Sequence, residues 1–123
     1  MTVAFWCVFV AALLPYVPVG LSQRFLDPRM PRKGVPNLEG TAARAYGAHL
    51  NAFEAFPPFA AAVIISHVVH GPSALVDWLA VLFIVARLAH MGFYLADRQP
   101  PRTASFFLGL IVVIVIFVQA AFH

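Results

Sequence analysis

Residues 52–69 read AFEAFPPFAAAVIISHVV and contain a single carboxylate, that of Glu54. The length of this run approaches the roughly 20 apolar residues that a membrane-spanning helix needs. A charged side chain near the centre of a bilayer costs at least about 2.5 to 3.5 kcal/mol on insertion scales, so it normally faces a protein interior or a wet cavity. The run therefore predicts a spanning helix with a polar site built into it.

Composition extends this prediction to the whole chain. Hydrophobic residues make up 62% of the 123 residues, charged residues only 11%, and the mean hydropathy is +0.86. Soluble domains have about 45 to 50% apolar and 25% charged residues, so this is an integral membrane protein. We predict one all-α domain over residues 1–123, a four-helix bundle with spans at about 2–21, 41–70, 74–97 and 102–121. The lone cysteine, Cys7, excludes an intrachain disulfide and a CxxC metal or redox pair.

Proline and hydroxyl residues predict where these helices bend and begin. Pro15 and Pro18 should loosen the last turns of the first span, and the pair at 57–58 should bend the second about midway. Thr41 and Ser73 can cap the second and third spans. Residues 22–40 are rich in proline and glycine and predict an extended loop, and residues 98–101 predict a short polar connection.

The basic residues predict the orientation. Lysine and arginine gather in the first and third connections, at Arg24, Arg29, Arg32, Lys33, Arg98 and Arg102. Because cytoplasmic loops carry an excess of these residues, both connections should be cytoplasmic and both termini should lie on the opposite side. Seven arginines against one lysine, with abundant alanine, indicate a bacterial protein and hence the bacterial cytoplasmic membrane.

Two polar stripes indicate where the chemistry is. One side of the second span carries Arg44, Asn51 and Glu54 at helical spacing. One side of the third carries Arg87, His90, Tyr94 and Arg98. Glu54 and Arg87 have two readings that stay open: a structural ion pair between helices, or direct contact with a ligand.

The remaining polar residues divide by position. We expect Asn51, Tyr94 and Arg102 to contact a ligand, whereas His49 is left open between an interior polar contact and a ligand contact. Three histidines at helix ends should occupy interface positions without a function: His67, His70 and His123. The histidine spacing matches no tight metal-ligand pattern, so we expect no metal site.

Two strings carry a resemblance to a known family. Residues 44–59 read RAYGAHLNAFEAFPPF and residues 86–94 read ARLAHMGFY. The Asn-x-x-Glu and Arg-x-x-His-x-x-x-Tyr elements, in this order on the second and third spans, resemble the membrane-associated proteins in eicosanoid and glutathione metabolism, the MAPEG family.

The resemblance implies a homotrimer with glutathione, as co-substrate, bound between neighbouring subunits near the cytoplasmic face. Arg102 stands where a family arginine stabilises the glutathione thiolate, so it is the expected catalytic residue. An adjacent guanidinium lowers the pKa of a thiol, which is otherwise about 8.5. The implied glutathione-binding positions are Arg24, His49, Asn51, Glu54, Arg87, His90, Tyr94 and Arg98.

The sequence also departs from the family pattern. Family enzymes commonly carry an arginine, which helps to bind a glutathione carboxylate, at the position of Gly47. Thr103 and Phe106 replace the serine and tyrosine of the prostaglandin synthase in this family, which argues against that isomerase. Two hypotheses follow: a glutathione transferase or peroxidase acting on lipophilic electrophiles within the membrane, or a non-catalytic lipid-binding or scaffold protein of the same fold.

Overall fold

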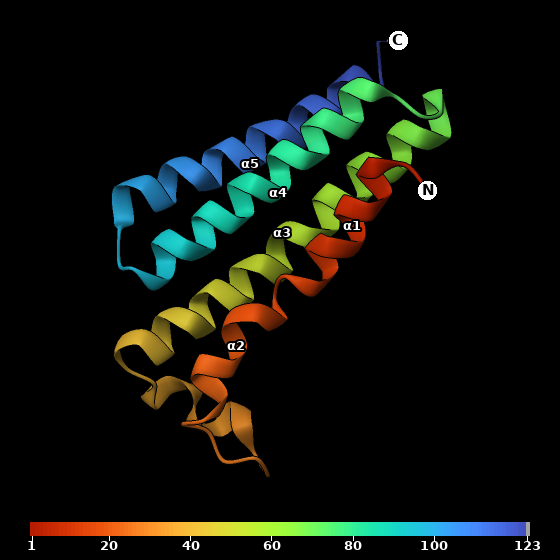
Figure 1. Cartoon of the computed structure of the whole chain (residues 1–123). Coiled ribbons are helices and arrows are strands. Elements are labelled where there is room, and N and C mark those ends of the chain that lie inside the picture. The colour runs from red at the N-terminus through yellow and green to blue at the C-terminus, as the bar shows by residue number, and fades with distance from the viewer. Residues whose placement is uncertain (123) are drawn as a thin grey trace.

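The computed structural model describes residues 1–122, which form a bundle of long helices (Figure 1). Four helical segments are long and apolar enough to cross a membrane, as expected for a multi-pass protein. The helices are α1 (Val3–Leu13), α2 (Tyr16–Gln23), α3 (Gly40–His70), α4 (Ala74–Leu95) and α5 (Gln99–Gln119), with a 3-10 helix η1 at Pro31–Asn37.

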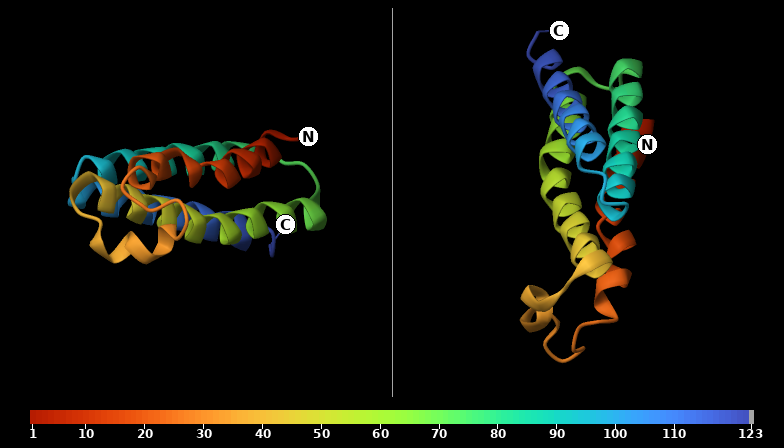
Figure 2. Two further views of the ribbon diagram at one scale, coloured as in Figure 1. Left: turned by 90° about the horizontal axis from the view of Figure 1, so that it is seen from below. Right: turned by 90° about the vertical axis from the view of Figure 1, so that its left-hand side faces the viewer.

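The helices pair along the bundle. α4 lies beside α5, and α1 and α2 follow one another along α3 (Figures 1 and 2). Both termini lie at the same end as the turn at residues 71–73, and we call this the terminal end. The opposite end carries η1 and the connection between α4 and α5. We call it the arginine end, after Arg24, Arg29, Arg32, Arg98 and Arg102.

The first span is broken where its prolines predicted a disturbance. α1 ends at Leu13 and α2 begins at Tyr16, with Pro15 buried between them. Proline lacks an N–H group and clashes with the preceding turn, so it interrupts the helical hydrogen bonds. At the break the carbonyl of Pro15 bonds instead with Nδ1 of His49 on α3, at 2.6 Å. This bond ties the break to the neighbouring helix.

α3 continues through Pro57 and Pro58 as one helix of 31 residues. Its start corrects one expectation. Glu39 is the N-cap and Gly40 is the first helical residue, so Thr41 lies too far along to cap the helix. The Thr41 hydroxyl instead accepts a hydrogen bond from Arg44 Nη2 at 3.1 Å. Ser73 is the N-cap residue of α4, as expected, but its side chain makes no capping hydrogen bond.

α5 begins at Gln99, three residues earlier than the sequence predicted. Pro100 and Pro101 fit into its first turn because the first N–H groups of a helix have no intrahelical acceptor. The loop prediction for residues 22–40 needs a similar correction. This stretch contains the last residues of α2 and the 3-10 helix η1, so it is only partly extended.

The turn from α4 into α5 is closed by a left-handed residue. Asp97 has φ of 58°. Its N–H bonds to the carbonyl of Tyr94 at 3.2 Å, and the N–H of Arg98 bonds to the carbonyl of Phe93 at 2.9 Å. This pair of bonds is the Schellman motif, which usually has glycine at the left-handed position. The turn fixes where α5, and therefore Arg102, begins.

Small residues let the helices approach closely. Ala4, Ala62 and Ala80 are completely buried where α1, α3 and α4 meet. Such residues are typical of membrane helix interfaces, where close backbone packing replaces the hydrophobic driving force. Between them, Phe59 and Phe83 stack with ring centroids 3.9 Å apart. The core therefore locks α3 against α4 near mid-span.

At the terminal end, polar side chains join the helices. His67 bonds Thr2 Oγ1 at 2.9 Å, and Gln119 Nε2 donates to Ser66 Oγ at 2.7 Å. Asp77 accepts from the backbone N–H of Ala4 at 2.7 Å. Further bonds at this end are His67 Nδ1 with the Val63 carbonyl, and His70 Nε2 with the Ala120 carbonyl. The interface positions expected for His67 and His70 stay a prediction, and His123 lies outside the described residues.

Candidate functional site

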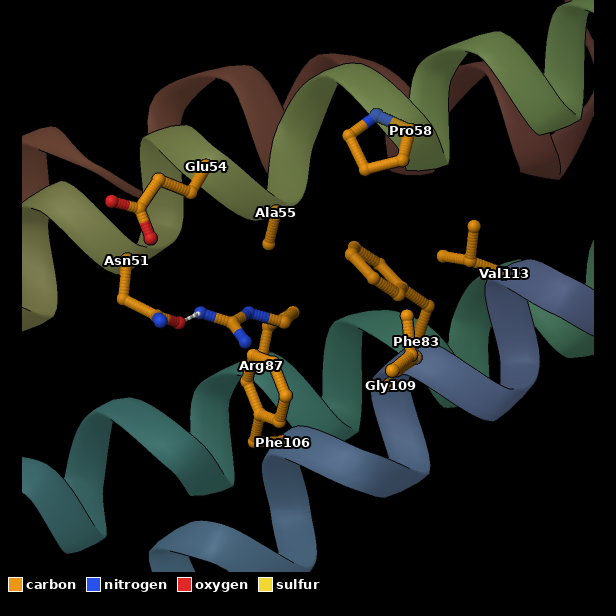
Figure 3. A pocket seen from close by; sticks show the side chains of 10 residues that line it. Asn51, Glu54, Ala55, Pro58, Phe83, Arg87, Phe106, Gly109 and Val113 are labelled. Carbon is orange, nitrogen blue, oxygen red and sulfur yellow. Dashed lines mark hydrogen bonds between the residues drawn. The ribbon is translucent and has the colours of Figure 1, made fainter.

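A cavity of about 190 Å³ lies between α3, α4 and α5 near mid-span (Figure 3). Most of its wall is apolar, and its polar residues gather at one end. The lining residues are Asn51, Glu54, Ala55, Pro58, Phe83, Arg87, Phe106, Gly109, Leu110 and Val113. The cavity thus brings together three polar residues that the two sequence stripes predicted.

Arg87 has a different partner from the one expected. Its side chain is 5% exposed, and it donates a short hydrogen bond from Nη2 to Oδ1 of Asn51 (Figure 3). No ion pair joins Arg87 to Glu54 within residues 1–122, so of the two readings left open, that of a direct ion pair within one subunit is not supported. Asn51 lies one helical turn before Glu54 and reaches the guanidinium instead. Glu54 acts on Arg87 only as a nearby charge.

Glu54 is exposed although it lies inside the span of α3. In Figure 3 its carboxylate lies near Asn51, and no hydrogen bond joins it to Arg87. No hydrogen bond or ion pair to this carboxylate occurs among the described residues. A free carboxylate at this depth is costly in hydrocarbon, so it requires water, a ligand or another subunit beside it.

A second group of side chains connects α4 with the first turn of α5. The guanidinium of Arg102 lies over the ring of Tyr94, with Cζ 4.5 Å from the ring centroid. The Tyr94 ring in turn lies edge-on to His90, with centroids 5.7 Å apart. His90 is buried, and its ring centroid is 6.2 Å from that of Phe106, which lines the cavity. Aromatic contacts therefore run from Arg102 to the cavity wall.

Gly47 on α3 lies directly beneath the Tyr94 hydroxyl. A Cβ atom added at Gly47 would lie 2.8 Å from Cζ of Tyr94 and closer still to its hydroxyl oxygen. Real Cβ atoms do not approach other heavy atoms so closely. In this chain the space at position 47 is therefore filled by a side chain from α4.

The arginine end has a strong positive character. Arg98 is the N-cap of α5 and Arg102 follows within its first turns, and no acidic residue lies in the first turn. The helix N-terminus itself carries a partial positive charge, so two cations here are mutually unfavourable without an anion. Neither arginine side chain makes a hydrogen bond or ion pair within the described part of the chain. An anion would be stabilised at this position.

The other predicted site residues lie outside these two groups. Arg24 is exposed at the end of α2, with Cζ 5.9 Å from the ring centroid of Phe25. His49 uses Nδ1 in its bond with Pro15 and packs edge-on against Phe53 at 4.9 Å. The interior polar contact that the sequence left open for His49 is therefore present. Its ligand contact, like that of Arg24, stays a prediction.

The MAPEG family model matches residues 3–122, which is nearly the whole chain. The chain belongs to the MAPEG family. Neither a curated protein nor a solved structure gave a match.

Sequence reasoning about this MAPEG protein missed two features of the site. Arg44 donates from Nε to the Leu95 carbonyl at 3.3 Å, so it fastens the end of α4 to α3. Its place in the motif gave no signal for this role, since the acceptor is a backbone atom on another helix. The contact between Gly47 and Tyr94 was also missed. The glycine within a helical pattern was a signal, because a helix interior disfavours glycine unless close approach requires it.

Proposed function

We propose that this MAPEG protein is a glutathione-dependent transferase or peroxidase acting on lipophilic electrophiles within the membrane, with Arg102 stabilising the glutathione thiolate. The observation that carries the proposal is the state of Arg102. Its guanidinium is half-buried, touches the Tyr94 ring and has no carboxylate partner within residues 1–122. Its charge is therefore available to an anion.

A thiolate suits this position. A thiol with pKa of about 8.5 is mostly protonated at neutral pH, and a neighbouring cation at a helix N-terminus lowers that pKa. Arg102 combines both conditions at the start of α5. The thiolate sulfur would attack an electrophilic carbon, forming a C–S bond as the leaving group departs with its electron pair. Removal of the cation would leave a thiol that reacts slowly.

The polar end of the cavity suits a ligand that carries both a positive and a negative group. Glu54 offers an unpaired carboxylate, while Asn51 and Arg87 offer N–H donors. Glutathione carries an ammonium group and two carboxylates, so it could satisfy both kinds of group. The rest of the wall, including Phe83, Phe106 and Val113, suits an apolar acceptor.

A homotrimer would cover the exposed charge in the span. Glu54 would otherwise face hydrocarbon at a cost of several kcal/mol. A neighbouring subunit placed over this face would close the groove and contribute to the ligand site, as MAPEG membership suggests. Crosslinking of the detergent-purified protein would contradict this proposal if it gave only monomers.

We further propose that the arginine end faces the cytoplasm of a bacterial cell and that both termini face the other side. The bias of lysine and arginine toward the first and third connections supports this orientation. A cysteine placed at Arg29 in a Cys7→Ser background should resist a membrane-impermeant maleimide added to intact cells. Labelling from outside would reverse the orientation.

A non-catalytic lipid-binding or scaffold protein is the second candidate. The observation that favours it is Gly47, where this chain has no side chain to bind a carboxylate and Tyr94 fills the space beside the α3 backbone. Loss of one charge-assisted contact removes about 1.5 to 3 kcal/mol, which is one to two powers of ten in affinity. Weak glutathione binding without thiolate formation would identify this candidate.

Calorimetry and ultraviolet spectroscopy separate the two candidates. Glutathione titrated into the purified protein should bind and give the absorption of a thiolate at neutral pH. Arg102→Ala should retain much of the binding but lose the thiolate signal, and conjugation of a small aryl halide should fall at least tenfold. Arg29→Ala, which removes the same charge from an exposed loop, is the matched control. Binding without a thiolate signal in the unmodified protein would contradict the enzyme proposal.

A further inference from the structure

We propose that Gly47 is a positioning residue: its missing side chain lets Tyr94 rest on α3, and Tyr94 in turn holds Arg102 at the thiolate site. The inference rests on the proposed role of Arg102. It also assigns Gly47 a new role: the missing side chain is needed for the packing of Tyr94, in addition to removing a ligand contact.

The contact at Gly47 is specific for glycine. The Tyr94 hydroxyl, Cζ and Cε1 are the three atoms that an added Cβ would meet, with Cε1 at 3.1 Å. The closest of them are the end of a rigid ring, so Tyr94 can clear a Cβ only by moving as a whole. No hydrogen bond holds its hydroxyl within the described residues. The fit to the α3 backbone therefore sets where the end of the ring lies.

Tyr94 has little freedom to move elsewhere. Its ring packs against a buried cluster formed by Leu14, Ala48 and Met91. His90 lies edge-on beside it. A ring held on these sides and pushed from α3 would be displaced toward α5, where Arg102 lies over its face.

Arg102 depends on this ring for its position. Within the described residues its guanidinium makes no hydrogen bond or ion pair; it makes the cation–π contact at 4.5 Å and acts on His90 as a nearby charge. Such contacts stabilise a cation over the face of an aromatic ring, more strongly where water is excluded. A long arginine side chain without the ring would sample many rotamers. Its mean distance from the sulfur would then increase.

The chain accepts a weaker helix at this point. Glycine inside a helix is destabilising relative to alanine. Gly92 on α4 supplies an internal comparison, because an added Cβ there would meet nothing within 4 Å. Alanine should therefore strengthen α4 at position 92, whereas at position 47 it must displace Tyr94. The two glycines differ in this contact rather than in helix propensity.

Fluorine NMR can follow Tyr94 without glutathione. The chain has three tyrosines, so 3-fluorotyrosine in a Tyr16→Phe/Tyr46→Phe background reports on Tyr94 alone. Gly47→Ala should shift this resonance, and Arg102→Ala should shift it by removing the cation from the ring face. Gly92→Ala is the matched control and should leave it unchanged. An unmoved resonance in Gly47→Ala would overturn the inference.

A double-mutant cycle tests whether Gly47 acts through Tyr94. Gly47→Ala should lower the thiolate signal and the conjugation rate roughly tenfold, since displacements of about 1 Å have effects of this size or larger. In a Tyr94→Leu background, which is already impaired, Gly47→Ala should change neither quantity further. Equal losses in both backgrounds would show that Gly47 acts independently of Tyr94 and would overturn the inference.

The two proposals fail in different ways. If the unmodified protein forms no thiolate, the function proposed for Arg102 is wrong, yet the fluorine resonance still shows whether Gly47 seats Tyr94. If the thiolate forms and Gly47→Ala leaves it intact, only the positioning role is wrong. If Gly47→Ala does not fold, Tyr94→Leu alone decides, because loss of the ring should remove most of the thiolate signal. A full signal in Tyr94→Leu overturns the inference.

Discussion

The two ends of the bundle differ: the arginine end, although Arg44 is bonded there to Thr41 and Leu95, also holds arginines whose side chains make no hydrogen bond within residues 1–122. At the terminal end, Thr2, Ser66, His67 and Asp77 are all joined to another helix by hydrogen bonds of 2.7 to 2.9 Å. At the arginine end, Arg98 and Arg102 have no hydrogen bond or ion pair through their side chains within residues 1–122. Polar groups that are paired within the chain stabilise the fold, and polar groups left unpaired are available to a ligand.

This difference has a physical basis. A buried donor or acceptor without a partner costs about 1 to 3 kcal/mol, so evolution of a stable bundle removes such groups or pairs them. The terminal end follows that rule. The arginine end retains cations beside the positive N-terminus of α5. This arrangement does not stabilise the isolated subunit. Substitutions at the two ends should therefore affect different properties.

The largest loss of stability is expected at Asn51, which lies between the two ends. Asn51→Ala would leave the buried guanidinium of Arg87 without its hydrogen bond. We expect the free energy of unfolding to fall by about 2 to 3 kcal/mol, measured by denaturation in detergent. Asn51→Asp is the control, because a carboxylate there can still accept from Arg87. An unchanged stability in Asn51→Ala would show that the hydrogen bond between Asn51 and Arg87 does not stabilise the fold.

A smaller loss is expected at the terminal end. Asp77→Ala removes the acceptor for the Ala4 N–H in the first turn of α1. Loss of such a cap lowers stability by about 1 to 2 kcal/mol. Asp77→Asn keeps an acceptor and should recover most of it. Arg98→Ala, an exposed change at the other end, should stay within about 0.5 kcal/mol. If Arg98→Ala proved the more damaging, the contrast between the ends would be wrong.

A small effect of the opposite sign, a gain in stability, is expected at Asp97. A left-handed residue other than glycine costs about 1 to 2 kcal/mol, less for aspartate, and Asp97 has φ of 58°. Asp97→Gly relieves this strain but adds freedom to the unfolded chain, so we expect a gain below about 1 kcal/mol. Thermal unfolding in detergent would measure it. A clear loss would show that the Asp97 carboxylate stabilises the arginine end through a contact of its own.

Much of the architecture could be predicted from local sequence. Apolar runs identified the four spans, and Pro15 predicted the disturbance that appears as the break between α1 and α2. Helical spacing placed Asn51 and Glu54 on one side of α3, and both line the same cavity with Arg87. These features depend on the helical spacing of residues and on the conformational limits of proline, and both can be read from a single sequence.

The pairing of side chains could not be predicted in the same way. Glu54 and Arg87 carry opposite charges, yet the guanidinium reaches Asn51 because of where the helices cross. The start of α5 was also placed too late, since proline reads as a break although the first turn tolerates it. The seat of Tyr94 on Gly47 joins residues 47 positions apart, and only the packed structure brings them together.

The fit between Gly47 and Tyr94 limits the order in which this protein can evolve. Any larger residue at position 47 collides with the ring while Tyr94 is present. In this chain a side chain at 47 therefore requires either a shift of the Tyr94 ring or a change at 94. A substitution that is harmful in one background becomes acceptable in another, which is epistasis between two helices. Randomised libraries of the two positions should return compensating pairs rather than independent changes.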